Sequence, residues 1–232
     1  MKRIVKLQIL LVALLAMQAA CGAVIEISEM NITVQVAEKA HFRYEITLKN
    51  KIDKPLVPGI SELRLQKVES RRLLLLPLPF GEKRCGVDVE NLRAYSGNMN
   101  FRSYYEKHGD YSSVYYEIWY PIEPHGEKEV VLEFDADLVD SGILFKSVTF
   151  PVGGDTDIRS LNVTFSSDWN LCYREGDASS VPANHIAFFT AEFSIIPLPV
   201  LPIRGYLLFW GFLLVFVLVA IVILRKRKNM RT

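Results

Sequence analysis

The sequence is poor in the patterns that carry enzymatic chemistry. Its four histidines, His41, His108, His125 and His185, lie far apart, and none belongs to an HExxH or other metal-ligand spacing. The chain also has no GxSxG turn for a nucleophilic serine and no glycine-rich phosphate-binding loop. We therefore expect a protein that is not an enzyme, with no catalytic residue, no cofactor, no metal and no nucleic-acid partner.

Cysteine is scarce, with three in 232 residues. Cys21 falls in the N-terminal segment considered below, which leaves Cys85 and Cys172 as an even pair. In an oxidising compartment such a pair favours a disulfide, and closing so long a loop contributes on the order of 4 kcal/mol in the chain-entropy model. Two unpaired thiols are the alternative, so Cys85 and Cys172 are a disulfide candidate.

Long apolar runs occur only at the two ends of the chain. From Gly205 to Leu224 every residue is apolar, aromatic or glycine. At about 1.5 Å per residue a helix of this length covers about 30 Å, the thickness of a bilayer's hydrocarbon core. The sequence thus predicts a transmembrane helix over 205–224, followed by a basic cytoplasmic tail over 225–232.

The N-terminal run has a different character. Basic residues at Lys2, Arg3 and Lys6 precede an apolar run from Leu7 to Met17, and small residues follow as far as Ala23. A basic start, a short apolar run and small residues at the end are typical of a secretory signal peptide. We predict a signal peptide over 1–23, with lipidation of Cys21 or an uncleaved anchor as alternatives.

Charge is divided unevenly along the chain. Residues 24–203 hold 18 basic and all 26 acidic residues, a net charge of −8, whereas the tail holds five basic residues and no acidic one. The positive-inside rule places such a tail in the cytoplasm. The expected topology is type I single-pass in the cell membrane, with the bilayer as one partner and the N-terminal domain extracellular.

Between the two runs, apolar residues recur at every second position. The segments HFRYEITLKN, MNITVQV, KEVVLEF and SLNVTF all show this alternation. It is typical of half-buried strands in an antiparallel sheet, and turn-forming residues separate the segments. We predict an all-β domain over 24–195, an antiparallel β-sandwich that is one large unit or two in tandem, followed by a proline-rich stalk over 196–204.

Aromatic residues concentrate in YYEKHGDYSSVYYEIWY, residues 104–120. Packing in the core and on the sheet face is the default reading, because a tyrosine buries its ring and keeps its hydroxyl wet. An aromatic platform for a protein or glycan is the alternative. The possible interaction surface comprises Tyr104, Tyr105, Tyr111, Tyr115, Tyr116, Trp119 and Tyr120.

Two asparagines lie in glycosylation sequons, Asn31 in NIT and Asn162 in NVT. In both predicted strands the asparagine falls on the polar face, where a sugar would reach solvent. Asn31 and Asn162 are therefore glycosylation candidates.

Three segments carry a resemblance to a known group of proteins: YEITLKN, YPIEPHGEKEVVLEF and SLNVTFSSDWNLCYREGD. They resemble the strand–turn–strand segments of archaeal single-pass surface proteins, whose β-sandwich ectodomain is similar to the lumenal part of ribophorin I. The resemblance covers about residues 30–195. It implies a β-sandwich outside the cell and a membrane helix after it.

Two functions fit these expectations. The first is a non-enzymatic surface protein whose β-sandwich binds a protein or glycan partner outside the cell. The alternative, implied by the resemblance, is an accessory subunit of a membrane enzyme complex for oligosaccharide transfer or transport.

Overall fold

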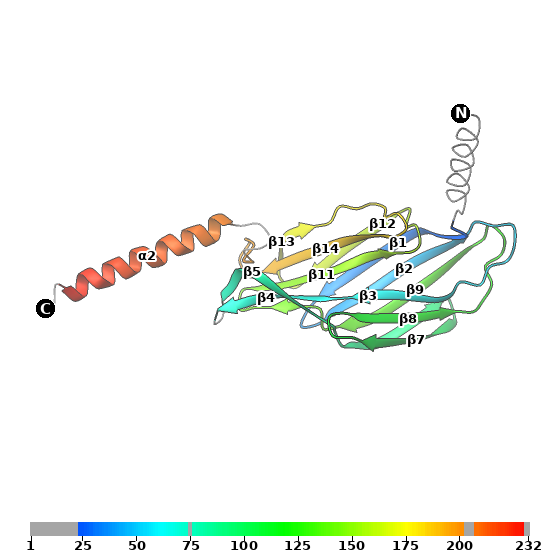
Figure 1. The fold of residues 1–232 in the computed structure, drawn as a ribbon, viewed down its shortest axis with the longest axis horizontal. Coiled ribbons are helices and arrows are strands. Elements are labelled where there is room, and N and C mark those ends of the chain that lie inside the picture. The colour runs from blue at the N-terminus through cyan, green and yellow to red at the C-terminus, as the bar shows by residue number, and fades with distance from the viewer. Residues whose placement is uncertain (1–22, 74–75, 202–206, 230–232) are drawn as a thin grey trace, which may run out of the picture.

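The computed structural model describes residues 23–73, 76–201 and 207–229 (Figure 1). Apart from its last residue, the predicted signal peptide lies outside the described residues, as does Cys21. Within these ranges the strands are β1 (Ile25–Val36), β2 (Ala40–Asn50), β3 (Gly59–Leu65), β4 (Lys67–Leu73), β5 (Leu76–Cys85), β6 (Val89–Ser96), β7 (Met99–Lys107), β8 (Ser112–Ile118), β9 (Glu127–Ala136), β10 (Asp140–Ser141), β11 (Phe145–Gly154), β12 (Leu161–Ser167), β13 (Asn170–Glu175) and β14 (His185–Ser194). Helix α2 spans Leu207–Asn229.

The strands form two main sheets and one hairpin. The larger sheet has the order β12-β1-β2-β9-β6-β7-β8-β3 and curves as a half-barrel. The smaller has the order β10-β11-β14-β13, and β4 and β5 form a separate two-stranded ribbon. Among the described strands β1 and β12 pair in parallel, with Met30 opposite Leu161, and the other strand pairs are antiparallel.

The predicted alternation of buried and exposed side chains is confirmed in four strands. On β2, for example, the side chains of Phe42, Tyr44, Ile46 and Leu48 are buried, whereas His41 and Glu45 between them are exposed. Each strand turns successive side chains to opposite faces, so one face of the larger sheet becomes the core. The same pattern holds on β1, β9 and β12, although Phe165 on β12 is only half-buried.

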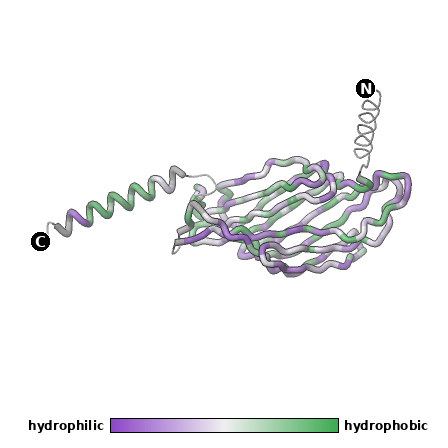
Figure 2. Tube along the Cα trace, in the orientation of Figure 1, coloured by the Kyte–Doolittle hydropathy of each residue, from purple (hydrophilic) through white to green (hydrophobic). Residues whose placement is uncertain are grey.

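Aromatic rings fill the space between the two sheets. Phe42 stacks on Phe134 of β9 with ring centroids 5.2 Å apart, and Tyr44 stacks on the same phenylalanine at 5.9 Å. From the smaller sheet, Phe150 of β11 meets Phe42 edge-on at 5.2 Å. One continuous cluster of buried residues therefore joins the two sheets, and Figure 2 shows the strands alternating between hydrophobic and hydrophilic residues around it.

A buried carboxylate holds the β4–β5 ribbon against the smaller sheet. Asp140 on β10 is 4% exposed, and its Oδ2 accepts a hydrogen bond from the backbone N–H of Ser70 at 2.9 Å. Its Oδ1 pairs with the guanidinium of Arg72, which lies 5.6 Å from the centroid of the Phe145 ring. The charge of Asp140 is thus matched on the ribbon that it fixes.

The chain after β14 folds back onto the smaller sheet. Glu192 on β14 is fully buried, and its Oε1 accepts hydrogen bonds from the backbone N–H groups of Val200 and Leu201. Both residues are buried in a small cluster with Phe145, and Trp210 of α2 packs against that cluster. Residues 196–201 of the predicted stalk therefore lie against the sheet, and 202–204 fall outside the described residues.

The predicted fold class is corrected at the C-terminus. The chain is mostly β, with 61% in strands, but none of the helices in the described ranges has the length and apolarity that crossing a membrane requires. The predicted transmembrane helix over 205–224 is wrong, and so is the single-pass membrane localisation drawn from it.

The predicted disulfide is also wrong, because Cys85 and Cys172 are both free thiols. Cys85 ends β5 opposite Lys67 in the ribbon, whereas Cys172 lies on β13 at the edge of the smaller sheet. A disulfide needs Cα atoms within about 7 Å of each other, and the two strands belong to different sheets. Burial raises the pKa of the Cys172 thiol, whose Sγ donates to the carbonyls of Asn170 and Ile196.

Candidate functional site

The outer face of β7, β8 and β3 gathers charged and aromatic side chains in a regular grid, which we call the β7–β8–β3 face. Strand register sets its three rows, each reading from β7 through β8 to β3. The rows are Arg102, Glu117 and Ile60; then Tyr104, Tyr115 and Glu62; then Glu106, Ser113 and Arg64.

This face points to solvent because the alternate residues of the same strands point to the core. On β8, Val114, Tyr116 and Ile118 are buried at 0–6% exposure. The period of two along a strand then turns Tyr115 and Glu117 outward. The core side of β8 thus fixes which residues the face presents.

Two tyrosines form a ridge across the middle row. The rings of Tyr104 and Tyr115 stack with centroids 5.0 Å apart and an angle of 25° between their planes. The guanidinium of Arg102 lies 5.7 Å from the centroid of Tyr104. Such cross-strand aromatic pairs and cation–π contacts hold long side chains in a defined arrangement.

Trp119 stands just beyond the first row and is 60% exposed. Its Nε1–H donates to Oε2 of Glu117 at 2.9 Å, which orients the indole. Ile60, in the same row as Glu117, is 54% exposed. The face therefore offers two large apolar groups to solvent beside the tyrosine ridge.

One carboxylate of the face is held by its neighbours. Glu62 accepts hydrogen bonds from Nε of Arg64 at 3.0 Å and from the Ser113 hydroxyl at 2.7 Å. These bonds lower the pKa of Glu62, and the bond from Arg64 has the largest effect, so Glu62 is ionised at neutral pH. The guanidinium of Arg64 also lies 5.5 Å from the centroid of Tyr111.

The structure divides the seven predicted aromatic residues. Tyr104, Tyr115 and Trp119 belong to or adjoin the face, whereas Tyr116 is in the core. Tyr120 packs against Phe101 with centroids 6.1 Å apart, Tyr111 packs against His108, and Tyr105 lies on the opposite side of β7 from Tyr104. Sequence reasoning missed the charged and aliphatic members of the face, because only the strand register places them beside the tyrosines.

A second polar cluster lies on the outer face of the larger sheet. His41 on β2 contacts Asp135 on β9 through Nδ1 and Oδ1 at 2.7 Å, and Asn91 donates from Nδ2 to Oδ2 of the same aspartate at 2.6 Å. These contacts lower the pKa of Asp135, and the hydrogen bond from Asn91 has the largest effect. Within the described residues the pair contacts no hydroxyl or thiol that it could activate, so the cluster supports the sheet rather than a reaction.

Replacing Asn91 with glycine should raise the pKa of Asp135. Asn91 has a φ of 53°, which glycine adopts without strain, so the change removes the amide donor and leaves the backbone as it is. A depressed pKa contributes stability above the unfolded value of about 3.9 and loses it as pH falls through the folded value. We therefore expect the free energy of unfolding of the Asn91→Gly variant to fall less between pH 5 and pH 2 than that of the wild type. Urea unfolding across that pH range measures the difference.

Asn184→Gly is the matched control, because Asn184 has a φ of 62° and does not contact Asp135. Equal acid sensitivity of the wild type and the Asn91 variant would contradict the assignment.

The two sequons meet across strands. The parallel register sets Asn31 opposite Asn162 and Thr33 opposite Thr164. Asn162 is exposed, whereas Asn31 is half-buried and donates from Nδ2 to Glu29 at 2.8 Å. Glycosylation at either position stays a prediction.

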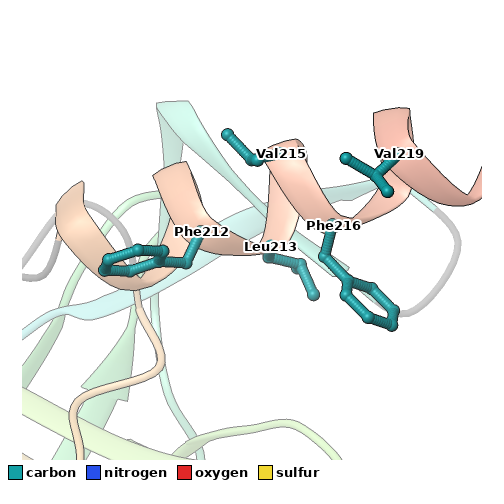
Figure 3. Close-up of a pocket in the computed structure, with 5 residues that line it drawn as sticks. All are labelled: Phe212, Leu213, Val215, Phe216 and Val219. Carbon is teal, nitrogen blue, oxygen red and sulfur yellow. The ribbon is translucent and has the colours of Figure 1, made fainter.

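Neither the apolar surface of α2 nor any cluster of metal-binding residue types adds a candidate site among the described residues. Figure 3 shows apolar residues from Phe212 to Val219 on α2, but all five come from one helix, so they form an open surface without polar groups. In the described part of the chain no group of three or more His, Cys, Asp or Glu residues is placed to hold a metal ion.

Comparison by sequence shows a relative among known proteins. No family model matches the chain. The uncharacterized protein MJ1395 of Methanocaldococcus jannaschii is 40% identical over 121 residues, which cover 51% of this chain and 92% of that protein. That description does not bear on the resemblance to ribophorin I, which stays a prediction.

Similar solved structures are remote. Leukotriene A4 hydrolase of Saccharomyces cerevisiae superposes with a TM-score of 0.38 at 8% identity, covering 72% of this chain and 29% of that one. The M1 zinc metallopeptidase of Deinococcus radiodurans gives 0.31 at 10% identity, covering 73% and 38%. The chain thus spans well under half of either protein, and similarity at this level carries no argument about activity.

Proposed function

The chain belongs to the same family as the uncharacterized protein MJ1395 of Methanocaldococcus jannaschii, and from this starting point we propose that it is a non-enzymatic interaction protein whose β7–β8–β3 face binds a partner protein. The observation that carries the proposal is the composition of that face. Its tyrosine ridge, exposed tryptophan and exposed arginines are the residue types that dominate binding energy at protein interfaces.

The arrangement of the rings favours a protein partner over a glycan. A sugar ring stacks on an open aromatic face, but Tyr104 and Tyr115 turn faces toward each other, and Arg102 lies over Tyr104. Two stacked tyrosine rings with charged neighbours instead resemble a protein interface, in which aromatic residues lie at the centre and polar residues form the rim. Binding of a polysaccharide to this face would instead show that the partner is a glycan.

Trp119→Ala should weaken partner binding by more than about tenfold, because truncating an aromatic hot-spot residue costs about 2 kcal/mol or more. Binding is measured by retention of proteins from native extract on the immobilised full chain, followed by titration of each retained protein. The matched control is Phe188→Ala, an aromatic residue 52% exposed on β14 of the other sheet. Equal loss in both variants, or loss in neither, would count against the β7–β8–β3 face as the binding site.

A further inference from the structure

We propose that the partner of the β7–β8–β3 face is a second copy of this chain, bound face to face around a two-fold axis. The inference rests on the proposed function, since it names the occupant of the same face. It follows from the order of charges along β7 and from how exposed those charges are.

Along β7 the charges of the face are self-complementary about the middle row. Arg102 and Glu106 lie on β7 two positions to either side of Tyr104, and their Cα atoms are about 13 Å apart. A two-fold axis along the Tyr104–Tyr115 row, perpendicular to the strands, exchanges the first row of one copy with the third row of the other. Arg102 of each copy then lies opposite Glu106 of the other, which makes two equivalent ion pairs.

These two charges are more exposed and less closely paired than Glu62 and Arg64. The Arg102 side chain is 77% exposed and approaches Glu117 only to 3.8 Å. Glu106 is exposed and makes no ion pair within the described residues. In contrast, Glu62 and Arg64 are already joined to each other at 3.0 Å.

The same axis brings apolar and aromatic groups to the centre. The ridge of Tyr104 and Tyr115 meets the ridge of the second copy on the axis, so the aromatic centre is flanked by the ion pairs. Ile60, exposed in the first row, comes to lie against the aliphatic part of Arg64 in the third row of the second copy. Under this single operation Arg102 meets Glu106 and Ile60 meets Arg64. Glu62, at the end of the middle row, comes to lie opposite its own copy, and its charge is matched within each copy by Arg64 at 3.0 Å.

The test is a charge exchange read by sedimentation velocity of the full chain over a range of concentrations. Arg102→Glu sets glutamate opposite Glu106 twice in each dimer, and Glu106→Arg sets two arginines opposite each other twice. Either single variant should raise the dimer dissociation constant at least about tenfold, because like charges face each other at an interface. The double variant restores opposite charges and should return the constant to near the wild-type value.

Several outcomes would overturn the inference. A wild-type monomer would do so, as would a dimer that neither single reversal weakens, since that dimer uses another surface such as the exposed side of α2. Failure of the double variant to recover would mean that Arg102 and Glu106 do not meet. Circular dichroism checks that each variant folds. If a charge-reversal variant does not fold, the neutral variants Arg102→Gln and Glu106→Gln are measured in its place. Loss of the dimer inference leaves the Trp119 experiment intact, because that experiment follows every protein retained from the extract, whereas sedimentation follows this chain alone.

Discussion

Phe42→Ala is expected to lower the free energy of unfolding by about 3–5 kcal/mol, the range for removing a buried phenylalanine from a packed core. Phe42 is fully buried and contacts rings from both sheets, Phe134 on one side and Phe150 on the other. Its loss leaves a cavity at the place where the sheets meet, and neither sheet can close it alone. Urea unfolding followed by tryptophan fluorescence measures the change.

Phe212→Ala provides the control for this prediction. It is the same substitution at a side chain that is 73% exposed on α2, and we expect a change within about 0.5 kcal/mol. Similar losses in the two variants would show that the aromatic cluster is not what joins the sheets.

Asp140→Ala is expected to release the β4–β5 ribbon from the smaller sheet. The change leaves the Ser70 N–H and the Arg72 guanidinium without their buried acceptor. Losing one partner of such a buried pair typically costs about 3–5 kcal/mol, and less here because the Arg72 side chain is 34% exposed. Hydrogen exchange of the Ser70 amide should accelerate by at least about tenfold, while amides of β2 change little.

Asp137→Ala tests the specificity of this effect. Asp137 pairs with Lys67 at the start of the same ribbon, but its side chain is 52% exposed. An exposed pair contributes at most about 1 kcal/mol, so exchange at Ser70 should stay close to the wild type. Equal acceleration in the two variants would mean that Asp140 has no special part in fixing the ribbon.

The strands with strict alternation could be predicted from the sequence, because burial on one face of a sheet leaves a period of two in the residues themselves. Met30, Ile32, Val34 and Val36 of β1 show it, and the structure buries all four. β4 (Lys67–Leu73) does not show it, and its described contacts with the rest of the chain include the polar pairs of Lys67 with Asp137 and of Arg72 with Asp140.

The site could be predicted only in part. Tyr104 and Tyr115 were identified by their residue type, but nothing local indicates that they stack, because their contact depends on the register between β7 and β8. Arg64 and Ile60 lie about 40 residues earlier in the chain and join the face through β3. Strand register is a long-range property that a single sequence records weakly.

Two predictions are wrong, the disulfide and the membrane-spanning helix, and both relied on composition without spatial information. Pairing Cys85 with Cys172 relied on their number, which carries no information about distance, and they lie in different sheets. The prediction of a spanning helix relied on the composition of one run without its surroundings. In the structure the chain before it folds back, and Trp210 packs against the small cluster of Phe145, Val200 and Leu201.

The parallel pairing of β1 with β12 has a consequence for how the chain acquires its structure during synthesis. β1 is made first and can pair at once with β2 through a short turn, but its other edge must wait for residues 161–167. Until then a growing chain carries a strand with a free edge, which is exposed to pairing with other nascent chains. Since contacts so distant in sequence slow the folding step that forms them, closure of this edge should be among the last events on the way to the native state.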